Sequence, residues 1–492
     1  MAKETRILIV HGWSDCSKSF VTLKQYLVSL GIGEVESVFY VDYESREDNM
    51  TYEDIIEGLN NQLIERRLVR NDGTSDYDLK IIVHSTGGLV VRHWLWRYYF
   101  HTRRMEKDKC PVTNLVMLAP ANFGSPLAQM GKSFIGGLVK GRWKVGDLLE
   151  TGKRILHGLE LGSAYQWKLA HRDLIEANYF TGATVRTTVL VGNRDYKGIR
   201  GWLNKPGTDG TVVIAGTNLN TVKLCLKFAT PHSLTELYKP HQWDTTTPAS
   251  QIAFAVLNNY DHGSIVDEAG IASLSSSAVS NVLVRALQVD EAGFEVFQQE
   301  LLAITSATYS NDNVDHYQQF LVHAVDYQEQ AAMDFTLDFA VFEKKRFKDG
   351  QVVVDADQTE NDAQGESQSD AEYQYSLEVN DLINKDAHTY SQDSSYRRFL
   401  VNTDALFAKI AEMNADHAFA DGYGIFMKVF VPAIDENIDY YTKNLENVLI
   451  YDSTGEDKNT IQFFFPNTTT LIELQVDRMN KNVWIDIEPR DH

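Results

Sequence analysis

Short apolar runs alternate with amphipathic segments along the first part of the chain. They predict alternating strands and helices at Thr5–Val10, Phe20–Leu30, Val35–Asp42, Tyr52–Leu68, Leu79–His84, Leu89–Arg103 and Val112–Leu118. The strand Thr5–Val10 has no apolar–polar alternation, which is typical of a strand covered on both faces. Strands and helices in this order predict βαβ units and a doubly wound, mostly parallel α/β sheet. The carboxyl ends of its strands meet at one edge, where we expect functional loops.

The pattern changes from about residue 313, where short runs are separated by Asn, Asp, Gly and Pro. We predict one helix at Asp404–Met413 and strands at Asp334–Phe342, Gln351–Val354, Gln374–Val379, Arg397–Val401, Gly424–Val431, Asn447–Tyr451, Ile461–Phe465, Leu471–Val476 and Val483–Ile487. Strands of this length and spacing are typical of a mainly-β, sandwich-like domain. Residues 355–372 contain seven acidic residues and no Lys or Arg, which favours a mobile loop.

These patterns predict three parts. Residues 1–290 form an α/β domain, residues 291–312 a helical bridge, and residues 313–492 a β-sandwich-like accessory domain. Residues 124–178 interrupt the strand–helix rhythm with apolar, Gly-containing segments that predict a helical insertion.

One strand end carries a candidate nucleophile. The apolar run Leu79–His84 stops at Ser85, and Gly87 follows two positions later, before the next helix. A strand, a sharp turn and a helix match the nucleophile elbow G-x-S-x-G, in which a strained Ser is exposed at the top of a parallel sheet. Val83 replaces the first Gly of that motif. Taken alone, a buried Ser beside a Gly pair is an equally good interpretation.

The end of the first strand is a second candidate element. It is followed by His11-Gly12-Trp13-Ser14-Asp15. A Gly directly after a strand lets backbone N–H groups turn outward, as an oxyanion hole requires. We therefore predict the N–H groups of Trp13 and Thr86 as oxyanion donors, with His11 as a structural residue behind the loop. The alternative is a plain strand-to-helix loop.

A third element follows the strand Val112–Leu118. It reads Ala119-Pro120-Ala121-Asn122-Phe123-Gly124-Ser125-Pro126-Leu127-Ala128. With the two elements above, it resembles the lipase branch of the α/β-hydrolase superfamily, in which "P-x-x-G-S-P-L-A" follows the nucleophile strand. That branch includes bacterial triacylglycerol lipases and the lecithin–cholesterol acyltransferase and glycosylphosphatidylinositol-deacylase-like groups. The resemblance covers roughly residues 5–270. It implies a lid at about residues 124–178 over an acyl-binding cleft, against the alternative of helices packed on the sheet.

The resemblance also implies a catalytic acid after the nucleophile in the chain. The segment Gly207-Thr208-Asp209-Gly210 resembles the acid turn of lipases, which makes Asp209 the predicted acid. Asp195 follows the strand-like run Arg186–Val191 and is the alternative. The neighbouring Arg194 favours an ion pair for Asp195 rather than a contact with the catalytic His.

The predicted base is His262, which comes after Asp209 as the chain order of the family requires. It lies in a loop with Gly263 and Ser264, behind the strand-like run Gln251–Leu257, and this loop resembles the catalytic His loop of lipases. We expect His84, although adjacent to Ser85 in sequence, to point away from the nucleophile and pack.

Composition narrows the function classes. The chain has 492 residues, 43% of them hydrophobic, and a net charge of −22. This hydrophobic share is typical of a folded protein, and the length allows two to three domains. The negative charge argues against nucleic acid as a partner and against electrostatic docking on anionic membranes. A transient hydrophobic contact with a lipid surface stays open.

Location and cofactors follow from what the sequence lacks. No apolar run approaches the roughly 18–20 residues of a membrane span. The N-terminus leads directly into the first predicted strand, so we expect no signal peptide and a cytoplasmic protein, with export without a cleaved signal as the alternative. Cys16, Cys110 and Cys225 are scattered, which predicts reduced thiols. We expect no cofactor and no metal, because neither a C-x-x-C pair nor a His/Cys cluster occurs. Calcium binding by the acidic loop 355–372 is the alternative, although the loop lacks the Gly-anchored spacing of a calcium loop.

Together, these features predict a serine esterase or lipase that cleaves lipid or acyl esters through an acyl-enzyme on Ser85, with His262 and Asp209. One alternative is an acyltransferase, or a phospholipase toxin or effector, with the same triad. Another is a non-catalytic scaffold whose β domain binds a protein partner.

Overall fold

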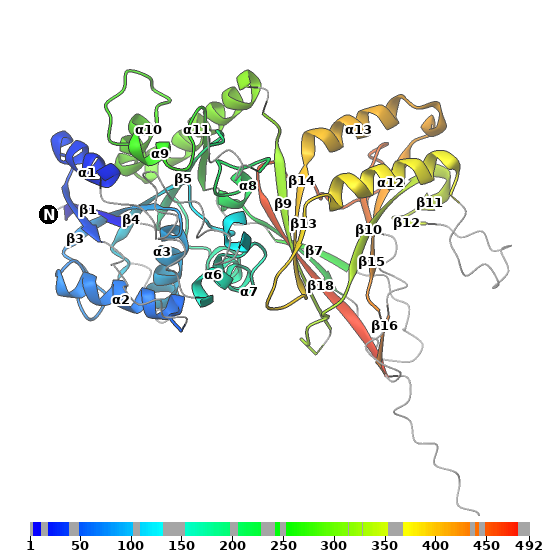
Figure 1. Cartoon of the computed structure of the whole chain (residues 1–492), viewed down its shortest axis with the longest axis horizontal. Coiled ribbons are helices and arrows are strands. Elements are labelled where there is room, and N and C mark those ends of the chain that lie inside the picture. The colour runs from blue at the N-terminus through cyan, green and yellow to red at the C-terminus, as the bar shows by residue number, and fades with distance from the viewer. Residues whose placement is uncertain are drawn as a thin grey trace, which may run out of the picture. The chain divides into compact units, whose positions relative to one another are not determined.

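The strands of the first half of the chain form one six-stranded sheet in the order β2-β1-β3-β4-β5-β8, with every neighbouring pair parallel (Figure 1). The strands are β1 (Glu4–Val10), β2 (Glu34–Val38), β3 (Tyr77–His84), β4 (Val112–Leu118), β5 (Arg186–Gly192) and β8 (Ala253–Leu257). Side chains of the central strands, such as Ile82 and Val116, are fully buried, as in a sheet covered on both faces. The predicted doubly wound parallel sheet is confirmed.

Helices connect and flank these strands in the computed structural model. They are α1 (Lys18–Leu30), α2 (Tyr52–Glu65), α3 (Gly87–Leu95), α8 (Ile214–Thr217), α9 (Ser264–Asp267), α10 (Val279–Gln288) and α11 (Glu291–Asp312). α1 and α10 lie on one side of the sheet and α2 on the other (Figure 1). The structure describes residues 3–10, 18–38, 49–101, 109–130, 153–196, 205–227, 242–246, 252–312, 314–326, 328–352, 368–432, 438–441 and 448–480. No helix within these ranges is both long and apolar enough to cross a membrane.

Helix α10 is fixed at its C-terminal end beside the amino ends of two central strands. The Lys80 ammonium of β3 donates to the carbonyl of Leu287 at 2.5 Å, and the Asn114 amide of β4 donates to the carbonyl of Ala286 at 2.9 Å. A ten-residue α-helix is about 15 Å long. At the other end of α10, the Val279 N–H donates to the hydroxyl of Tyr260, which follows the carboxyl end of β8, so this end lies toward the carboxyl edge of the sheet.

The predicted insertion between β4 and β5 is helical where the structure describes it. Its helices are the 3₁₀ helix η3 (Pro126–Met130), α6 (Lys153–Leu159), α7 (Ala164–Ala170) and the π-helix η4 (His171–Glu176). The part of the predicted lid between residues 131 and 152 lies outside the described residues.

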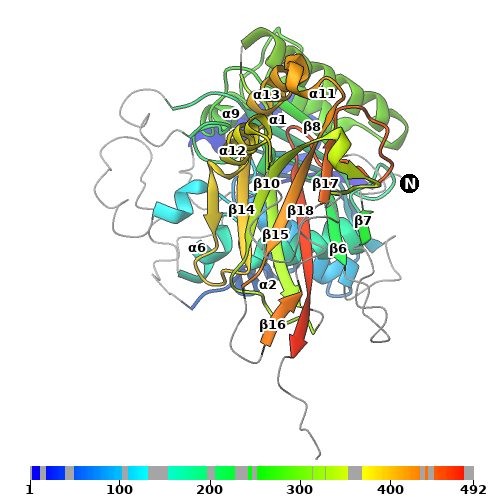
Figure 2. The same cartoon turned by 90° about the vertical axis from the view of Figure 1, so that its right-hand side faces the viewer.

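The remaining strands, most of them in the second half of the chain, form two larger sheets (Figure 2). One sheet has the order β13-β14-β9-β18-β6-β7, with β16 paired to β18, and the other has the order β10-β15-β17. The strands are β6 (Val222–Lys227), β7 (Gln242–Thr246), β9 (Tyr317–Asp326), β10 (Thr336–Glu343), β13 (Ala387–Thr389), β14 (Tyr396–Asn402), β15 (Tyr423–Phe430), β16 (Ile438–Tyr441), β17 (Val448–Asp452) and β18 (Thr469–Asn480). A short hairpin joins β11 (Phe347–Lys348) and β12 (Gln351–Val352).

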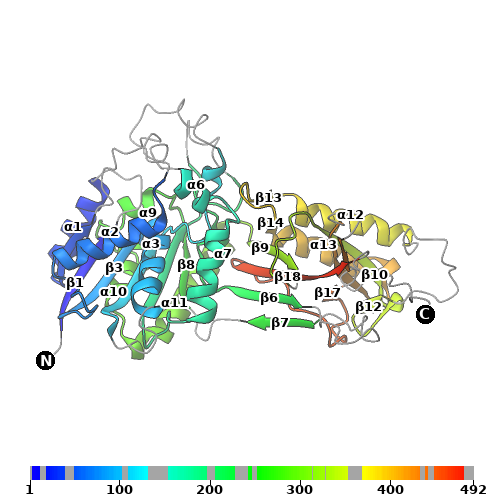
Figure 3. The same ribbon diagram turned by 90° about the horizontal axis from the view of Figure 1, so that it is seen from below.

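Two predicted strands of this half are wrong. Gln374–Val379 lies inside helix α12 (Asp370–Asn384), and Ile461–Phe465 is not part of a strand. The helix α12 packs beside α13 (Thr403–Ala415), which confirms the predicted helix at Asp404–Met413 (Figure 3). The predicted strand Val483–Ile487 and most of the acidic loop 355–372, residues 355–367, lie outside the described residues.

The chain divides into two compact units. The first unit comprises residues 1–222, 246–319 and 466–469, and the second comprises residues 223–245, 320–465 and 470–492. These limits differ from those of the predicted domains. Helix α11, predicted as a bridge, packs on β8 in the first unit, where the Thr308 hydroxyl donates to the carbonyl of Val256 at 2.8 Å. Strands β6 and β7, expected in the α/β domain, join the larger sheet of the second half.

Candidate active site

Ser85 occupies a strained turn between β3 and α3. Its φ of 54° lies in the left-handed region, which a residue with a side chain adopts only under constraint. The constraint comes from β4 and the loop behind it: the Ser85 N–H donates to the carbonyl of Leu118 at 3.2 Å, and the Ala121 N–H donates to the carbonyl of Ser85 at 3.0 Å. A Cβ on Gly88 would lie 2.8 Å from the Cβ of Pro120, so this position requires a Gly. The turn has the geometry of a nucleophile elbow.

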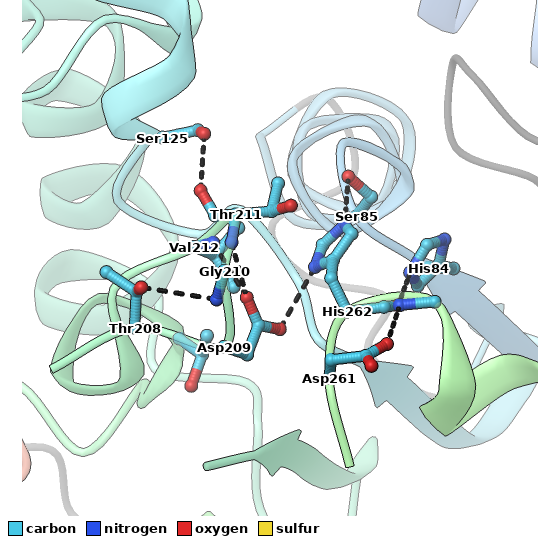
Figure 4. A network of polar contacts seen from close by, with 12 residues as sticks. His84, Ser85, Ser125, Thr208, Asp209, Gly210, Thr211, Val212, Asp261 and His262 are labelled. Atoms are coloured by element: carbon cyan, nitrogen blue, oxygen red, sulfur yellow. Dashed lines mark hydrogen bonds and ion pairs between the residues drawn. The ribbon is translucent and has the colours of Figure 1, made fainter. Parts of the chain in front are cut away.

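The three predicted triad residues meet at the carboxyl edge of the sheet (Figure 4). Nε2 of His262 lies 3.2 Å from the Oγ of Ser85, and Nδ1 of the same ring lies 3.0 Å from the Oδ2 of Asp209. Asp209 is fully buried and His262 is 2% exposed. The buried carboxylate selects the tautomer with the proton on Nδ1, which leaves Nε2 as the acceptor for the Ser85 hydroxyl.

The turn that carries Asp209 fixes the direction of its carboxylate. Oδ1 accepts the N–H groups of Thr211 and Val212 at 3.0 and 2.8 Å, so Oδ2 is left for His262. Gly210 has a φ of 92°, and a Cβ there would lie 2.7 Å from the Tyr196 ring. The Ser125 hydroxyl donates to the carbonyl of Thr211 at 2.6 Å. The conspicuous Gly-Ser-Pro stretch after β4 therefore holds the acid turn in place.

Asp195, the alternative acid, occupies a different environment. Burial raises its pKa above the ordinary value, and the negative charge of Asp209 raises it further. The charge of Asp209 thus acts on Asp195, but the carboxylate that is hydrogen-bonded to His262 is that of Asp209. Arg194 does not pair with Asp195 as we expected; its guanidinium donates to Asp261 at 2.8 Å and so holds the loop that carries His262.

Of the two predicted oxyanion donors, the structure describes only Thr86. Thr86 directly precedes α3 and has helical backbone angles, φ −62° and ψ −20°. Its N–H therefore begins the helix that follows the nucleophile. Trp13 and His11 lie outside the described residues. The oxyanion hole stays a prediction.

His84 contacts the predicted base, His262, which the sequence did not indicate. Its Nε2 donates to the backbone carbonyl of His262 at 3.0 Å, and the two ring centroids are 4.6 Å apart. The ring is 1% exposed. We infer that His84 is a positioning residue for the His262 backbone. Its place at the end of β3, beside the nucleophile, was the only signal in the sequence.

We expect His84→Phe to lower kcat of ester hydrolysis about tenfold, because one hydrogen bond of about 1–1.5 kcal/mol to the His262 backbone is lost while ring volume is kept. His84→Gln retains an N–H donor and should recover part of the loss. The pH dependence of kcat/KM measures whether the His262 imidazole is perturbed. An unchanged kcat and pH profile in the Phe variant would assign His84 to packing alone.

A buried ion pair anchors helix α3, which follows Ser85, and the sequence did not indicate this pair. Arg92 of α3 and Asp173 of η4 are both fully buried, and the guanidinium contacts both carboxylate oxygens at 2.7 and 3.0 Å. Arg92 also donates to the backbone carbonyl of Asn122 at 3.2 Å. Ala121, which directly precedes Asn122, donates its N–H to the carbonyl of Ser85. This network therefore links α3, the insertion and the turn that carries Ser85.

We expect Asp173→Asn to lower the free energy of unfolding by about 3–5 kcal/mol, because it leaves the buried Arg92 charge without a counter-ion. Asp76→Asn is the matched control. Asp76 pairs with Arg70 at 2.6 Å, with side chains 66% and 59% exposed, and its loss should cost less than about 1 kcal/mol. Urea unfolding followed by circular dichroism measures both variants. Equal effects would contradict the anchoring role of Arg92.

Comparison with known proteins places the fold. No protein-family model and no curated protein sequence matches this chain. Among solved structures, phospholipase PlaB from Legionella pneumophila is 21% identical, with a TM-score of 0.73 over 100% of this chain and 98% of that one. The same phospholipase in complex with thio-NAD is 22% identical, with a TM-score of 0.69 over 99% and 98% of the two chains. The likeness shows a common fold along the whole length, and the α/β-hydrolase fold of the first half is confirmed.

Proposed function

We propose that this chain is a serine esterase or lipase that hydrolyses carboxylic esters of acyl lipids. The observation that carries the proposal is the hydrogen-bonded line from the Ser85 hydroxyl through both ring nitrogens of His262 to the buried Asp209. A Ser hydroxyl is a weak nucleophile until a base takes its proton, and a neutral imidazole is an effective base when a carboxylate fixes its tautomer. The hydrogen bonds among the three residues support this chemistry.

The mechanism follows from this geometry. His262 Nε2 takes the proton of Ser85 as the oxygen attacks the ester carbonyl, and Asp209 stabilises the imidazolium that forms. The N–H groups of Thr86 and Trp13 are the proposed donors to the tetrahedral oxyanion. His262 then gives its proton to the leaving alcohol, which leaves an acyl group on Ser85. Water, deprotonated by His262, attacks this acyl-enzyme and releases the acid.

An acyl lipid is the substrate class that we favour. A helical insertion lies between β4 and β5, where a lid would cover an acyl-binding cleft. The full-length likeness is to a protein named a phospholipase, which supports a phospholipid ester as the first candidate. The same triad would serve an acyltransferase, in which a second alcohol replaces water, or a phospholipase effector. A non-catalytic scaffold with a protein-binding second unit is the alternative without chemistry.

An ester panel tests the proposal. Wild type and Ser85→Ala are assayed together on p-nitrophenyl esters of increasing chain length and on phospholipid vesicles, and a fluorophosphonate probe reports a reactive Ser. We expect hydrolysis that increases with acyl length and probe labelling in wild type only. Transfer of the acyl group to an added alcohol instead of water would favour the acyltransferase. Silence on every ester and no labelling would favour the scaffold.

A further inference from the structure

A loop without charged residues connects α9 to α10. It comprises residues 269–278, and no Asp, Glu, Lys, Arg or His occurs between Glu268 and Arg285. The chain as a whole is 23% charged, with a net charge of −22. We refer to residues 269–278 as the uncharged loop. Figure 1 shows it projecting beside α9 and α10.

The uncharged loop lies at the same edge of the sheet as the candidate triad. Tyr260 follows the carboxyl end of β8, two residues before His262, and its hydroxyl accepts the N–H of Val279 at 3.3 Å. Val279 is the first residue of α10, whose other end is fixed beside the amino ends of β3 and β4. The uncharged loop therefore enters α10 at the carboxyl edge of the sheet, the edge at which Ser85 is located.

Two aliphatic side chains of the uncharged loop face water. Leu274 is fully exposed and Ile271 is 54% exposed. The base of the loop is seated on α1, because a Cβ on Gly270 would lie 2.6 Å from the backbone nitrogen of Leu23. The remaining residues of the loop are Ala, Ser and one Gly, so they carry short side chains or none. Leu274 and Ile271 are thus the largest groups that the loop presents.

The uncharged loop also lines a pocket without charged residues. A pocket of about 560 Å³ is bounded on one side by Ser273, Ser275 and Ser277 of the loop and on the other by Ile304 and Thr308 of α11. None of its lining residues is charged. A carboxylate or ammonium group near an apolar layer would have to be desolvated or moved aside. Neither the loop nor the pocket wall carries such a group.

We propose that the uncharged loop is a docking surface for a neutral, zwitterionic phospholipid layer, with the side chains of Leu274 and Ile271 entering its apolar part. This rests on the proposed function, since docking at this edge presents lipid esters to Ser85. A strongly negative protein gains nothing from anionic lipids and must bind a bilayer through apolar contacts. Short Ser and Ala side chains around two exposed aliphatic groups fit insertion into a fluid layer, because they offer a protein partner little shape to match.

Vesicle binding tests the docking without chemistry. In the Ser85→Ala background, the protein is sedimented with phosphatidylcholine vesicles. We expect Leu274→Ser to lower the partition coefficient about tenfold and the pair Ile271→Ser and Leu274→Ser about a hundredfold, from the apolar area that no longer inserts. Leu274→Phe should keep binding. Val296→Ser on α11 removes an equally aliphatic side chain that is 64% exposed, and it should change nothing.

Two results would overturn the docking surface. One is a double variant that sediments with vesicles as the parent does. The other is a parent that self-associates without lipid in analytical ultracentrifugation while the double variant does not, with equal vesicle binding, because the loop is then a contact between copies. Intact vesicle binding by a wild type that hydrolyses no ester of the panel, of any chain length, and is not labelled by the fluorophosphonate probe would contradict the proposed function and leave the docking surface standing.

Discussion

Ser85→Ala is expected to lower kcat for ester hydrolysis by about 10⁵–10⁶-fold, because it removes the hydroxyl that contacts Nε2 of His262 and that we propose forms the acyl-enzyme. The fold should persist, since the Ser85 side chain contributes one hydrogen bond to His262 and the turn is held by backbone bonds to β4 and to the loop behind it. Single-turnover kinetics on a p-nitrophenyl ester measure the loss. Ser29→Ala, in an exposed position of α1, is the matched control and should retain full activity.

Backbone strain gives this prediction a second readout. Ser85 adopts a φ of 54°, which a Gly adopts without steric cost. Ser85→Gly should therefore be as inactive as Ser85→Ala yet more stable than it, by about 1 kcal/mol. Thermal unfolding of the two variants measures the difference. Hydrolysis that survives in both variants would remove Ser85 from the chemistry, whatever the stabilities.

The sequence predicted those parts of the site that depend on short local segments. The turn after β3 needs a small residue where helix and loop pass close together, and Gly88 supplies it. The acid turn is similarly local, because Asp209 bonds the N–H groups two and three residues later. Such requirements are visible as Gly and Asp at fixed offsets in the chain. The parallel sheet was predictable for the same reason, since continuous apolar strands reveal burial on both faces.

The contacts that the sequence did not reveal join distant segments. Arg92 and Asp173 are 81 residues apart, and the nitrogen of His84 reaches a carbonyl 178 residues away. An Arg on an apolar helix gives no sign of its partner. The ion pair of Arg194 was misassigned to its sequence neighbour for this reason, although its partner Asp261 lies 67 residues further on.

Helix α12 shows how one local signal can override another. Tyr375, Leu377 and Val379 alternate with polar residues, which predicts a strand. The capping box decides otherwise: the Ser369 side chain accepts the N–H of Glu372 and the Glu372 carboxylate accepts the N–H of Ser369. Val379 is fully buried at helical spacing from Glu372, whereas Leu377 is 49% exposed. The capping box therefore outweighs a three-residue alternation in this segment.

Asp209→Asn is expected to lower kcat by about 10⁴-fold, because the Asn amide can donate to Nδ1 of His262 and so favours the tautomer that keeps the proton on Nε2. That ring cannot take the proton of Ser85. Asp195→Asn should change kcat less than tenfold, because Asp195 interacts with Asp209 through electrostatic repulsion between the two carboxylates and makes no hydrogen bond to His262. Steady-state kinetics of both variants on one ester measure the contrast.

The comparison of these two carboxylates is decisive for the mechanism because both follow β5 in the chain and the charge of Asp209 acts on Asp195. If Asp195→Asn were the inactive variant, His262 would have to rotate away from the buried Oδ2 of Asp209 during turnover. The hydrogen bonds of Oδ1 to Thr211 and Val212 would then hold a structural turn only. A severe loss in Asp209→Asn with an unfolding free energy near that of wild type assigns the carboxylate to catalysis, since a structural turn would lose stability as well.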